Sequence, residues 1–192
     1  MSVRTPVPVL RPIPFMYHFG VTLTSLLFLP GVRVEGAQNV PATGPVIIAG
    51  SHASGLDPLV LAQVVPRGRF IQYMAKKELF KNPVLAWLLR SFGTFPVNRE
   101  GNDVGAIRSA LRILQAGGTL GIFPQGTRGG TEIQPGTALI ALRAKSPVVP
   151  TLIRREGRRW TVRYGPPITS EGGVEELTAK IGAAIGVLRG QG

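Results

Sequence analysis

Short apolar runs alternate with segments of helical hydrophobic period along most of the chain. Runs that are rich in β-branched residues and bounded by Gly or Pro predict strands. These runs are residues 32–35, 46–49, 70–74, 94–97, 119–123, 148–153 and 160–164. Apolar residues that recur every three or four positions predict helices. The predicted helices are residues 58–65, 83–91, 104–115, 136–145 and 174–188. This alternation predicts a single α/β domain whose mostly parallel or mixed sheet is flanked by helices.

One longer apolar stretch, residues 15–29, precedes these elements. As a helix its 15 residues would extend about 22 Å, whereas the hydrocarbon core of a bilayer is about 30 Å thick. We therefore predict an N-terminal membrane-associating segment at 1–31. Its helix would lie in the membrane interface, and Arg11 and Arg33 would flank it. The alternative is a helix packed on the domain's own core. No export signal is recognised, so the expected location is the cytoplasmic side of the cell membrane, peripheral or monotopic.

The charge composition favours anionic partners. Twenty-two Lys and Arg residues against ten Asp and Glu give a formal net charge of +12. Such a surplus suits nucleic acid, an acidic membrane surface or phosphorylated small molecules. The basic residues are dispersed, and the one denser stretch, residues 143–163, is equally well explained as a solvated face. The chain has no Cys and two His, which excludes disulfides, thiol catalysis, thiolate metal sites and all-His metal cages. We expect no metal.

The most distinctive local feature is SHASGLDP at residues 51–58, here called the first motif. It follows a predicted strand and ends where a helix starts, so the side chains of His52 and Asp57 can converge across the loop. A carboxylate on one imidazole nitrogen fixes the tautomer and raises the basicity of the other nitrogen. No G-x-S-x-G elbow is present, so His52 is interpreted as a base that acts on a substrate hydroxyl. The alternative is that Asp57 is only the N-cap of the helix.

Another feature is FPQGTR at residues 123–128, directly after a predicted strand. It is the third motif in chain order and is called the third motif below. Gly126, Thr127 and Arg128 would offer a phosphate group backbone N–H donors, a hydroxyl and a guanidinium. A common turn explains the same pattern. The second motif, GTFPVNR at 93–99, also puts an Arg just past a predicted strand, and AKKEL puts Lys76 beyond a third. These strand ends could deliver cations to one crevice that contains His52.

Taken in order, these motifs resemble those of the PlsC-type glycerolipid acyltransferases, the lysophosphatidic acid acyltransferase family. The family's blocks NHxSxxDP, GxxFVxR and FPEGTR are similar to SHASGLDP, GTFPVNR and FPQGTR. Its fourth block, a short apolar run with Pro, is similar to VVPTLI at residues 148–153, here the fourth motif. The resemblance covers residues 32–165 and makes 32–192 the expected acyltransferase domain.

The resemblance implies a reaction and a role for each site residue. His52 would be the general base on the acceptor hydroxyl, and Asp57 its orienting partner. The implied phosphate-binding residues are Arg99, Gly126, Thr127 and Arg128, with Lys76 as a helper. The hydroxyl of lysophosphatidic acid would attack the thioester of acyl-CoA or acyl carrier protein directly and give phosphatidic acid. The thioester is a co-substrate, and no cofactor or metal is implied. Membrane lipids would be the partners, with the basic surface favouring anionic headgroups.

Residue 125 departs from the family pattern, because Gln125 stands where the family usually has Glu. Gln keeps the shape but loses the charge, so Gln125 is a candidate for the acceptor site. An acceptor other than lysophosphatidic acid, such as a lyso-aminolipid or other lysolipid, is therefore an alternative. A non-catalytic module that binds lipid or nucleic acid is a second one. Nucleic acid is not expected as a partner, because 7% of residues are aromatic and no recognised binding motif occurs.

Overall fold

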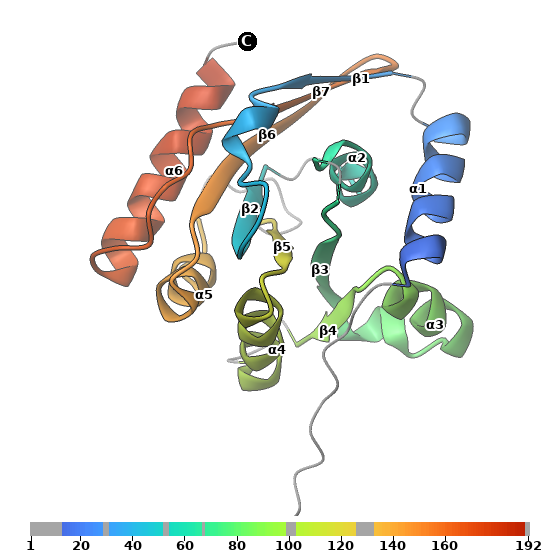
Figure 1. The fold of residues 1–192 in the computed structure, drawn as a ribbon, viewed down its shortest axis with the longest axis horizontal. Coiled ribbons are helices and arrows are strands. Elements are labelled where there is room, and N and C mark those ends of the chain that lie inside the picture. The colour runs from blue at the N-terminus through green and yellow to red at the C-terminus, as the bar shows by residue number, and fades with distance from the viewer. Residues whose placement is uncertain are drawn as a thin grey trace, which may run out of the picture.

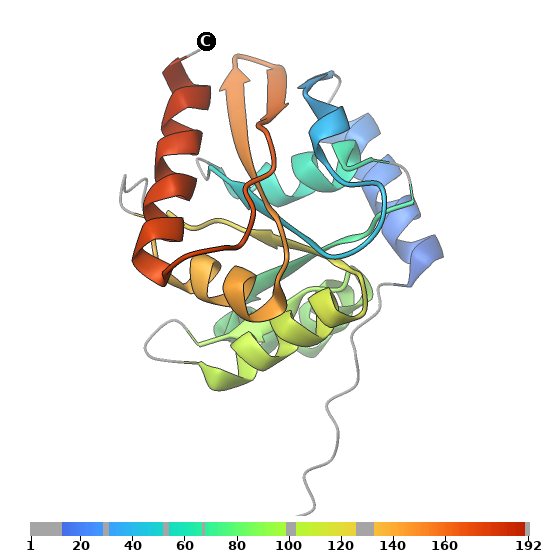
Figure 2. The ribbon, with the colours of Figure 1, turned by 60° about the vertical axis from the view of Figure 1, so that its left-hand side comes forward.

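A seven-stranded sheet forms the centre of the molecule, and helices cover both of its faces (Figures 1 and 2). The computed structural model describes residues 13–28, 31–51, 54–66, 68–98, 103–125 and 133–190. The strands are β1 (Val32–Glu35), β2 (Val46–Gly50), β3 (Ile71–Lys76), β4 (Phe95–Val97), β5 (Thr119–Ile122), β6 (Val148–Glu156) and β7 (Arg159–Tyr164). Their order is β1-β7-β6-β2-β5-β3-β4. All neighbouring pairs are parallel except the β6–β7 hairpin, which confirms the prediction of one α/β domain with a mixed sheet.

The helices divide between the two faces of the sheet. They are α1 (Pro14–Phe28), α2 (Asp57–Val64), α3 (Pro83–Ser91), α4 (Val104–Gln115), α5 (Gly136–Ala144) and α6 (Val174–Gly190). Ile47 and Ala49 of β2 pack in one core cluster with residues of α4, α5 and α6. Val46 and Ile48 pack in the other cluster, with residues of α1 and α2. A strand buried on both faces needs an apolar residue at every position, and β2 reads VIIAG.

One face of α1 packs on the domain, as the alternative interpretation of this segment held. Tyr17 is buried, its ring meets Phe70 edge-on at 5.1 Å between centroids, and its hydroxyl accepts a hydrogen bond from the Ile71 N–H at 3.2 Å. Phe15 and Phe19 are exposed on the same helix. No helix in the described part of the chain is long and apolar enough to cross a bilayer.

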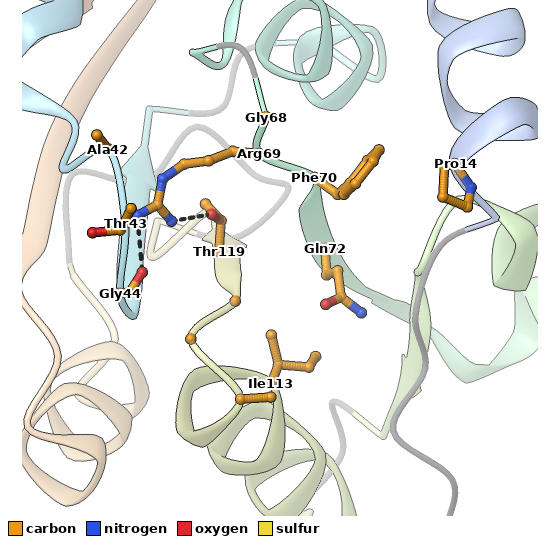
Figure 3. Close-up of a pocket in the computed structure, with 13 residues that line it drawn as sticks. Pro14, Ala42, Thr43, Gly44, Gly68, Arg69, Phe70, Gln72, Ile113 and Thr119 are labelled. Atoms are coloured by element: carbon orange, nitrogen blue, oxygen red, sulfur yellow. Dashed lines mark hydrogen bonds between the residues drawn. The ribbon is translucent and has the colours of Figure 1, made fainter.

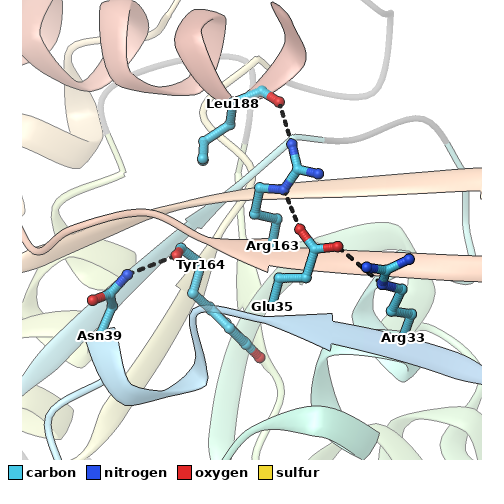
Figure 4. A network of polar contacts seen from close by, with 6 residues as sticks. All are labelled: Arg33, Glu35, Asn39, Arg163, Tyr164 and Leu188. Carbon is cyan, nitrogen blue, oxygen red and sulfur yellow. Dashed lines mark hydrogen bonds and ion pairs between the residues drawn. The ribbon is translucent and has the colours of Figure 1, made fainter. Parts of the chain in front are cut away.

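A polar network ties β1 and β7 to the end of α6 (Figure 4). The Glu35 carboxylate accepts hydrogen bonds from the guanidinium of Arg163, at 2.5 Å, and pairs with Arg33 at 3.0 Å. Arg163 also donates to the Leu188 carbonyl at 3.3 Å. The Arg163 hydrogen bond lowers the pKa of Glu35. Part of the charge in the basic stretch 143–163 is thus compensated inside the fold, and the last turn of α6 is held against β7.

Candidate functional site

The first and third motifs lie at one edge of the sheet, where they follow the carboxyl ends of parallel strands, and the second and fourth motifs include strands of the same sheet. The first motif follows β2 and the third follows β5, while the fourth lies in β6 on the other side of β2. Ala49 of β2 is paired with Ile122 of β5, so the two motifs leave neighbouring strands at the same level. β3, which ends at Lys76, and β4, within the second motif, continue this edge. Ligands of open α/β sheets bind at such carboxyl edges.

The loop of the first motif is anchored on both sides of His52. Before it, Ser51 is buried, and its backbone N–H donates to the Thr151 carbonyl of β6 at 2.9 Å. The Ser51 hydroxyl accepts from the Ile153 N–H at 2.9 Å. After it, the Ser54 hydroxyl accepts from the Leu56 N–H at 3.2 Å, which forms a tight turn into α2. Ser51, where the family usually has Asn, therefore clamps the start of the loop to the fourth motif.

Asp57 closes this loop and does not cap the helix, so the N-cap interpretation is wrong. α2 begins at Asp57 itself, the N-cap residue is Leu56, and no side chain caps the helix. The Asp57 carboxylate instead reaches back and accepts a hydrogen bond from the Ser54 N–H at 2.7 Å. The Asp57 side chain is fully buried. This hydrogen bond holds the Asp57 carboxyl group beside the loop that carries His52.

A stacked aromatic pair joins β3 to the first residue of the third motif. The rings of Tyr73 and Phe123 are parallel within 9°, with centroids 6.0 Å apart. The Tyr73 hydroxyl donates to the Pro58 carbonyl at 2.9 Å, which links β3 to the start of α2. Burial raises the pKa of Tyr73 well above its usual value, and the charge of Asp57 contributes a smaller increase. Tyr73 therefore remains a neutral hydrogen-bond donor. Through Pro58 and Phe123 it contacts both the first and the third motif.

The third motif is tied to the C-terminal helix through Gln125. This residue is buried, and its side-chain oxygen accepts a hydrogen bond from the Arg189 guanidinium at 2.6 Å. Arg189 lies in the last turn of α6, which Arg163 also holds. A carboxylate at position 125 could accept the same hydrogen bond. No sequence pattern pointed to Arg189, because it lies 64 residues from Gln125 in a helix without motif residues.

This contact makes a prediction about stability. Arg189→Met should lower the free energy of unfolding by about 1 kcal/mol, because the Gln125 oxygen then stays buried without its donor. Gln125→Glu should leave it unchanged or slightly higher, since a carboxylate accepts a charge-assisted bond from the guanidinium. Lys180→Met on the same helix, which breaks the exposed pair with Glu176, is the control and should cost less. Urea denaturation measures all three, and equal stability of Arg189→Met and wild type would contradict the role given to Arg189.

The second motif is held by a residue that the sequence analysis did not single out. The Asp103 carboxylate accepts hydrogen bonds from the Asn98 N–H at 2.6 Å and from the Ala106 N–H at 2.9 Å. These two bonds lower the pKa of Asp103, which caps α4 and fixes the residue directly before Arg99. An Asp immediately before a helical hydrophobic period is the sequence signal that could have found it. Lys76 ends β3 and lies 3.9 Å from the Glu78 carboxylate.

The structure places three of the predicted site residues, namely Asp57, Lys76 and Gln125, at the motif-bearing edge. The others lie outside the described residues: His52, Arg99, Gly126, Thr127 and Arg128. Their loops are nevertheless bounded, since the Gln134 N–H donates to the Pro124 carbonyl at 3.0 Å across the base of the third motif. Among the described residues no three His, Cys, Asp or Glu side chains gather to form a metal site.

The fold and its motif-bearing edge define an α/β domain with a site at the carboxyl ends of β2 and β5. The profile of the Acyltransferase family matches residues 31–154, and the chain belongs to this family. A crystal structure of the 1-acyl-sn-glycerophosphate (LPA) acyltransferase, PlsC, from Thermotoga maritima has the same fold. It matches with a TM-score of 0.72 and 24% identity, covering 93% of this chain and 79% of that one.

Curated relatives carry a common name. The 1-acyl-sn-glycerol-3-phosphate acyltransferase of Bacillus subtilis (strain 168) is 37% identical over 123 residues, 62% of this chain and 61% of the relative. The protein of that name from Streptococcus pneumoniae is 35% identical over 133 residues, 64% of this chain and 49% of the relative. The human 1-acyl-sn-glycerol-3-phosphate acyltransferase alpha is 29% identical over 171 residues, 78% and 60% of the two chains. The chain thus spans 49% to 61% of the length of these relatives.

Proposed function

We propose that the chain transfers a fatty acyl group from an acyl thioester to the free hydroxyl of lysophosphatidic acid, giving phosphatidic acid. One observation carries the proposal: the first and third motifs leave the neighbouring parallel strands β2 and β5 at the same edge. Family membership and the shared name of the relatives support the reaction class. The acyl donor is acyl-CoA or acyl carrier protein that carries a fatty acyl thioester.

In the proposed mechanism His52 takes the proton of the acceptor hydroxyl. The oxygen then attacks the thioester carbonyl, the carbon–sulfur bond breaks, and the imidazolium returns the proton to the leaving thiolate. Asp57 accepts a hydrogen bond from the other ring nitrogen and stabilises the imidazolium. The anchors at Ser51 and Ser54 support this role, because they fix the chain on both sides of the base.

The phosphate of the acceptor would bind to the cationic residues of the second and third motifs. Arg128 follows β5, next to β2, whereas Arg99 follows β4, two strands further along the edge. With adjacent strands about 4.8 Å apart, β4 lies roughly 14 Å from β2. Arg128 is therefore the primary phosphate ligand in this proposal, with Gly126 and Thr127 shaping its loop, and Arg99 and Lys76 complete the pocket.

An apolar surface on α1 and α3 is the proposed membrane contact. The Ile13 N–H donates to the Ser91 carbonyl at 3.1 Å, so the two helices meet at the start of α1 and the end of α3 (Figure 1). Each helix exposes large apolar side chains: Phe15, Phe19, Leu23 and Leu26 on α1, and Val84, Leu85, Trp87 and Leu88 on α3. Exposed apolar patches of this kind mark interaction sites, and the net charge of +12 favours an anionic lipid surface. We propose peripheral docking on the cytoplasmic side, where CoA and carrier-protein thioesters are made.

The two tryptophans test this contact directly. Trp87 is 57% exposed on the proposed surface, whereas Trp160 is 2% exposed in the core. Vesicles with anionic lipid should therefore shift the fluorescence of the chain to the blue, and brominated acyl chains should quench it. The Trp87→Phe variant, which keeps Trp160, should show neither effect. Sedimentation of the wild type with vesicles without any change in Trp87 emission would place the contact elsewhere.

The acceptor is tested by release of free thiol from oleoyl-CoA with a panel of lysolipids. Turnover with lysophosphatidic acid would support the proposal and show that Gln125 is compatible with this acceptor. Turnover only with another lysolipid, such as a lyso-aminolipid, would favour the alternative acceptor that the motif departure at Gln125 suggests. No turnover with CoA or carrier-protein donors would favour a non-catalytic lipid-binding module.

A further inference from the structure

A cavity of about 530 Å³ opens at the amino ends of β2, β5 and β3, on the edge opposite to the motifs (Figure 3). Its lining includes the polar side chains of Thr43, Arg69, Gln72 and Thr119 and the apolar side chains of Phe70 and Ile113. None of these residues belongs to the four motifs. The cavity therefore lies apart from the proposed acyl-transfer site.

Arg69 is a buried cation in the wall of this cavity, with 8% of its surface exposed. Its guanidinium donates to the Thr119 hydroxyl at 2.7 Å and to the Gly44 carbonyl at 2.9 Å, which are both neutral acceptors (Figure 3). No carboxylate in the described part of the chain pairs with Arg69, and burial lowers its pKa. Buried charges in proteins are normally paired.

One donor of Arg69 is left over. Its Nε–H is buried and has no hydrogen-bond partner among the described residues. Buried polar groups nearly always have a partner, so an orphaned N–H on a cation indicates a missing acceptor. The favoured acceptors of a guanidinium are carboxylate and phosphate oxygens.

Glycines line the cavity. Gly44, Gly68 and Gly117 line it with φ values of +76°, +88° and +76°, a conformation that favours glycine. No atom lies within 4 Å of where their Cβ atoms would be. The remaining space borders Phe70 and Ile113, which suit an apolar group beside the charged one.

We propose that this cavity binds the anionic group of a small amphiphile, a carboxylate or phosphate that accepts from Arg69 while the apolar part lies against Phe70 and Ile113. The site neither contains residues of the proposed reaction nor depends on that reaction. It gives the chain a second ligand site, on the opposite edge of the sheet.

The Nε–H of Arg69 is itself the reporter in the test. The full chain is labelled with ¹⁵N in a non-ionic detergent, and the Arg69 Nε–H resonance is assigned as the signal that Arg69→Lys removes. Inorganic phosphate, octyl phosphate, octanoate and octyltrimethylammonium are then titrated. We expect saturable shifts of this resonance with octyl phosphate or octanoate, and no shift with the cation. The affinity for octyl phosphate or octanoate should be at least tenfold higher than the affinity for inorganic phosphate.

Each other result has a defined meaning. Equal affinity for inorganic phosphate and octyl phosphate would assign the site to a free anion and overturn the amphiphile. An unmoved resonance with every anion, in a folded chain, would show that Arg69 only ties the loop before β2 to β5, and would overturn the proposal.

A variant that leaves Arg69 in place guards against loss of folding. Ala116 lines the cavity and is exposed, so Ala116→Trp should fill the space and weaken octyl phosphate binding at least tenfold while the Arg69 signal persists. Ala179→Trp, at an exposed position of α6, is the matched control and should bind like the wild type. Equal binding by both variants would place the ligand outside the cavity.

Discussion

Replacing Asp57 with Asn should lower the rate of acyl transfer by about 10²–10⁴-fold, the range that a positioned acid–base group contributes. Asn is isosteric, and its side-chain oxygen can still accept the hydrogen bond from the Ser54 N–H that Asp57 accepts at 2.7 Å. The loop should therefore keep its shape. The variant loses the negative charge that would orient His52 and stabilise its imidazolium, so the rate should fall without a comparable loss of stability.

Asp103→Asn is the matched control, because Asp57 and Asp103 are the two aspartates of the chain. Asp103 also accepts backbone hydrogen bonds at a motif, but it serves the second motif and not the loop of His52. Its replacement should cost less than tenfold in rate. The pH–rate profile separates orientation from structure, since the acid limb should move to lower pH only in Asp57→Asn. A folded Asp57→Asn variant with a wild-type rate and profile would refute the role of Asp57.

Gly121→Ala should lower the free energy of unfolding by about 2–3 kcal/mol, in the upper part of the range for overpacking a core. A Cβ at Gly121 would lie 2.3 Å from the Tyr73 ring and 3.0 Å from Ile71. The Tyr73 ring cannot retreat easily, because it stacks on Phe123 and its hydroxyl is bonded to Pro58. A displaced Tyr73 should also disturb its contacts with Pro58 of the first motif and Phe123 of the third motif, and so reduce activity.

Gly186→Ala is the control for Gly121→Ala, because the chemical change is identical and the surroundings are open. Gly186 lies within α6, with no atom within 4 Å of an added Cβ. This variant should gain about 0.5–1 kcal/mol from helix propensity. Urea denaturation at constant pH compares the two variants. A Gly121→Ala variant as stable as the wild type would show that the Tyr73 position is not fixed.

The fold was largely predictable because burial on both faces leaves a plain signal. β2 is a continuous apolar run, the first six residues of β6 are apolar except Thr151, and α4 keeps a regular helical period. The order of the strands was not predictable, because it depends on long-range pairing. β1, for example, pairs with β7, more than a hundred residues later.

The site was predictable to the extent that its chemistry is local in sequence. His52 and Asp57 share one loop, and the first and third motifs come at the ends of predicted strands. Contacts between distant segments were missed, notably Arg189 on Gln125, because helix α6 carries no motif. The N-cap role given to Asp57 was wrong because the carboxylate bonds back to the Ser54 N–H. Asp103 precedes α4 and caps it, whereas Asp57 is the first residue of α2.

The most direct test of the central claim measures the product. The full chain is incubated in non-ionic detergent with oleoyl-CoA and lysophosphatidic acid, and phosphatidic acid is quantified by mass spectrometry beside the free thiol. The wild type should form one phosphatidic acid for each thiol released, and His52→Ala should lose about 10²–10⁴-fold of this rate. A folded wild type that forms no phosphatidic acid from either acyl-CoA or acyl carrier protein, or a His52→Ala variant as active as the wild type, would contradict the account.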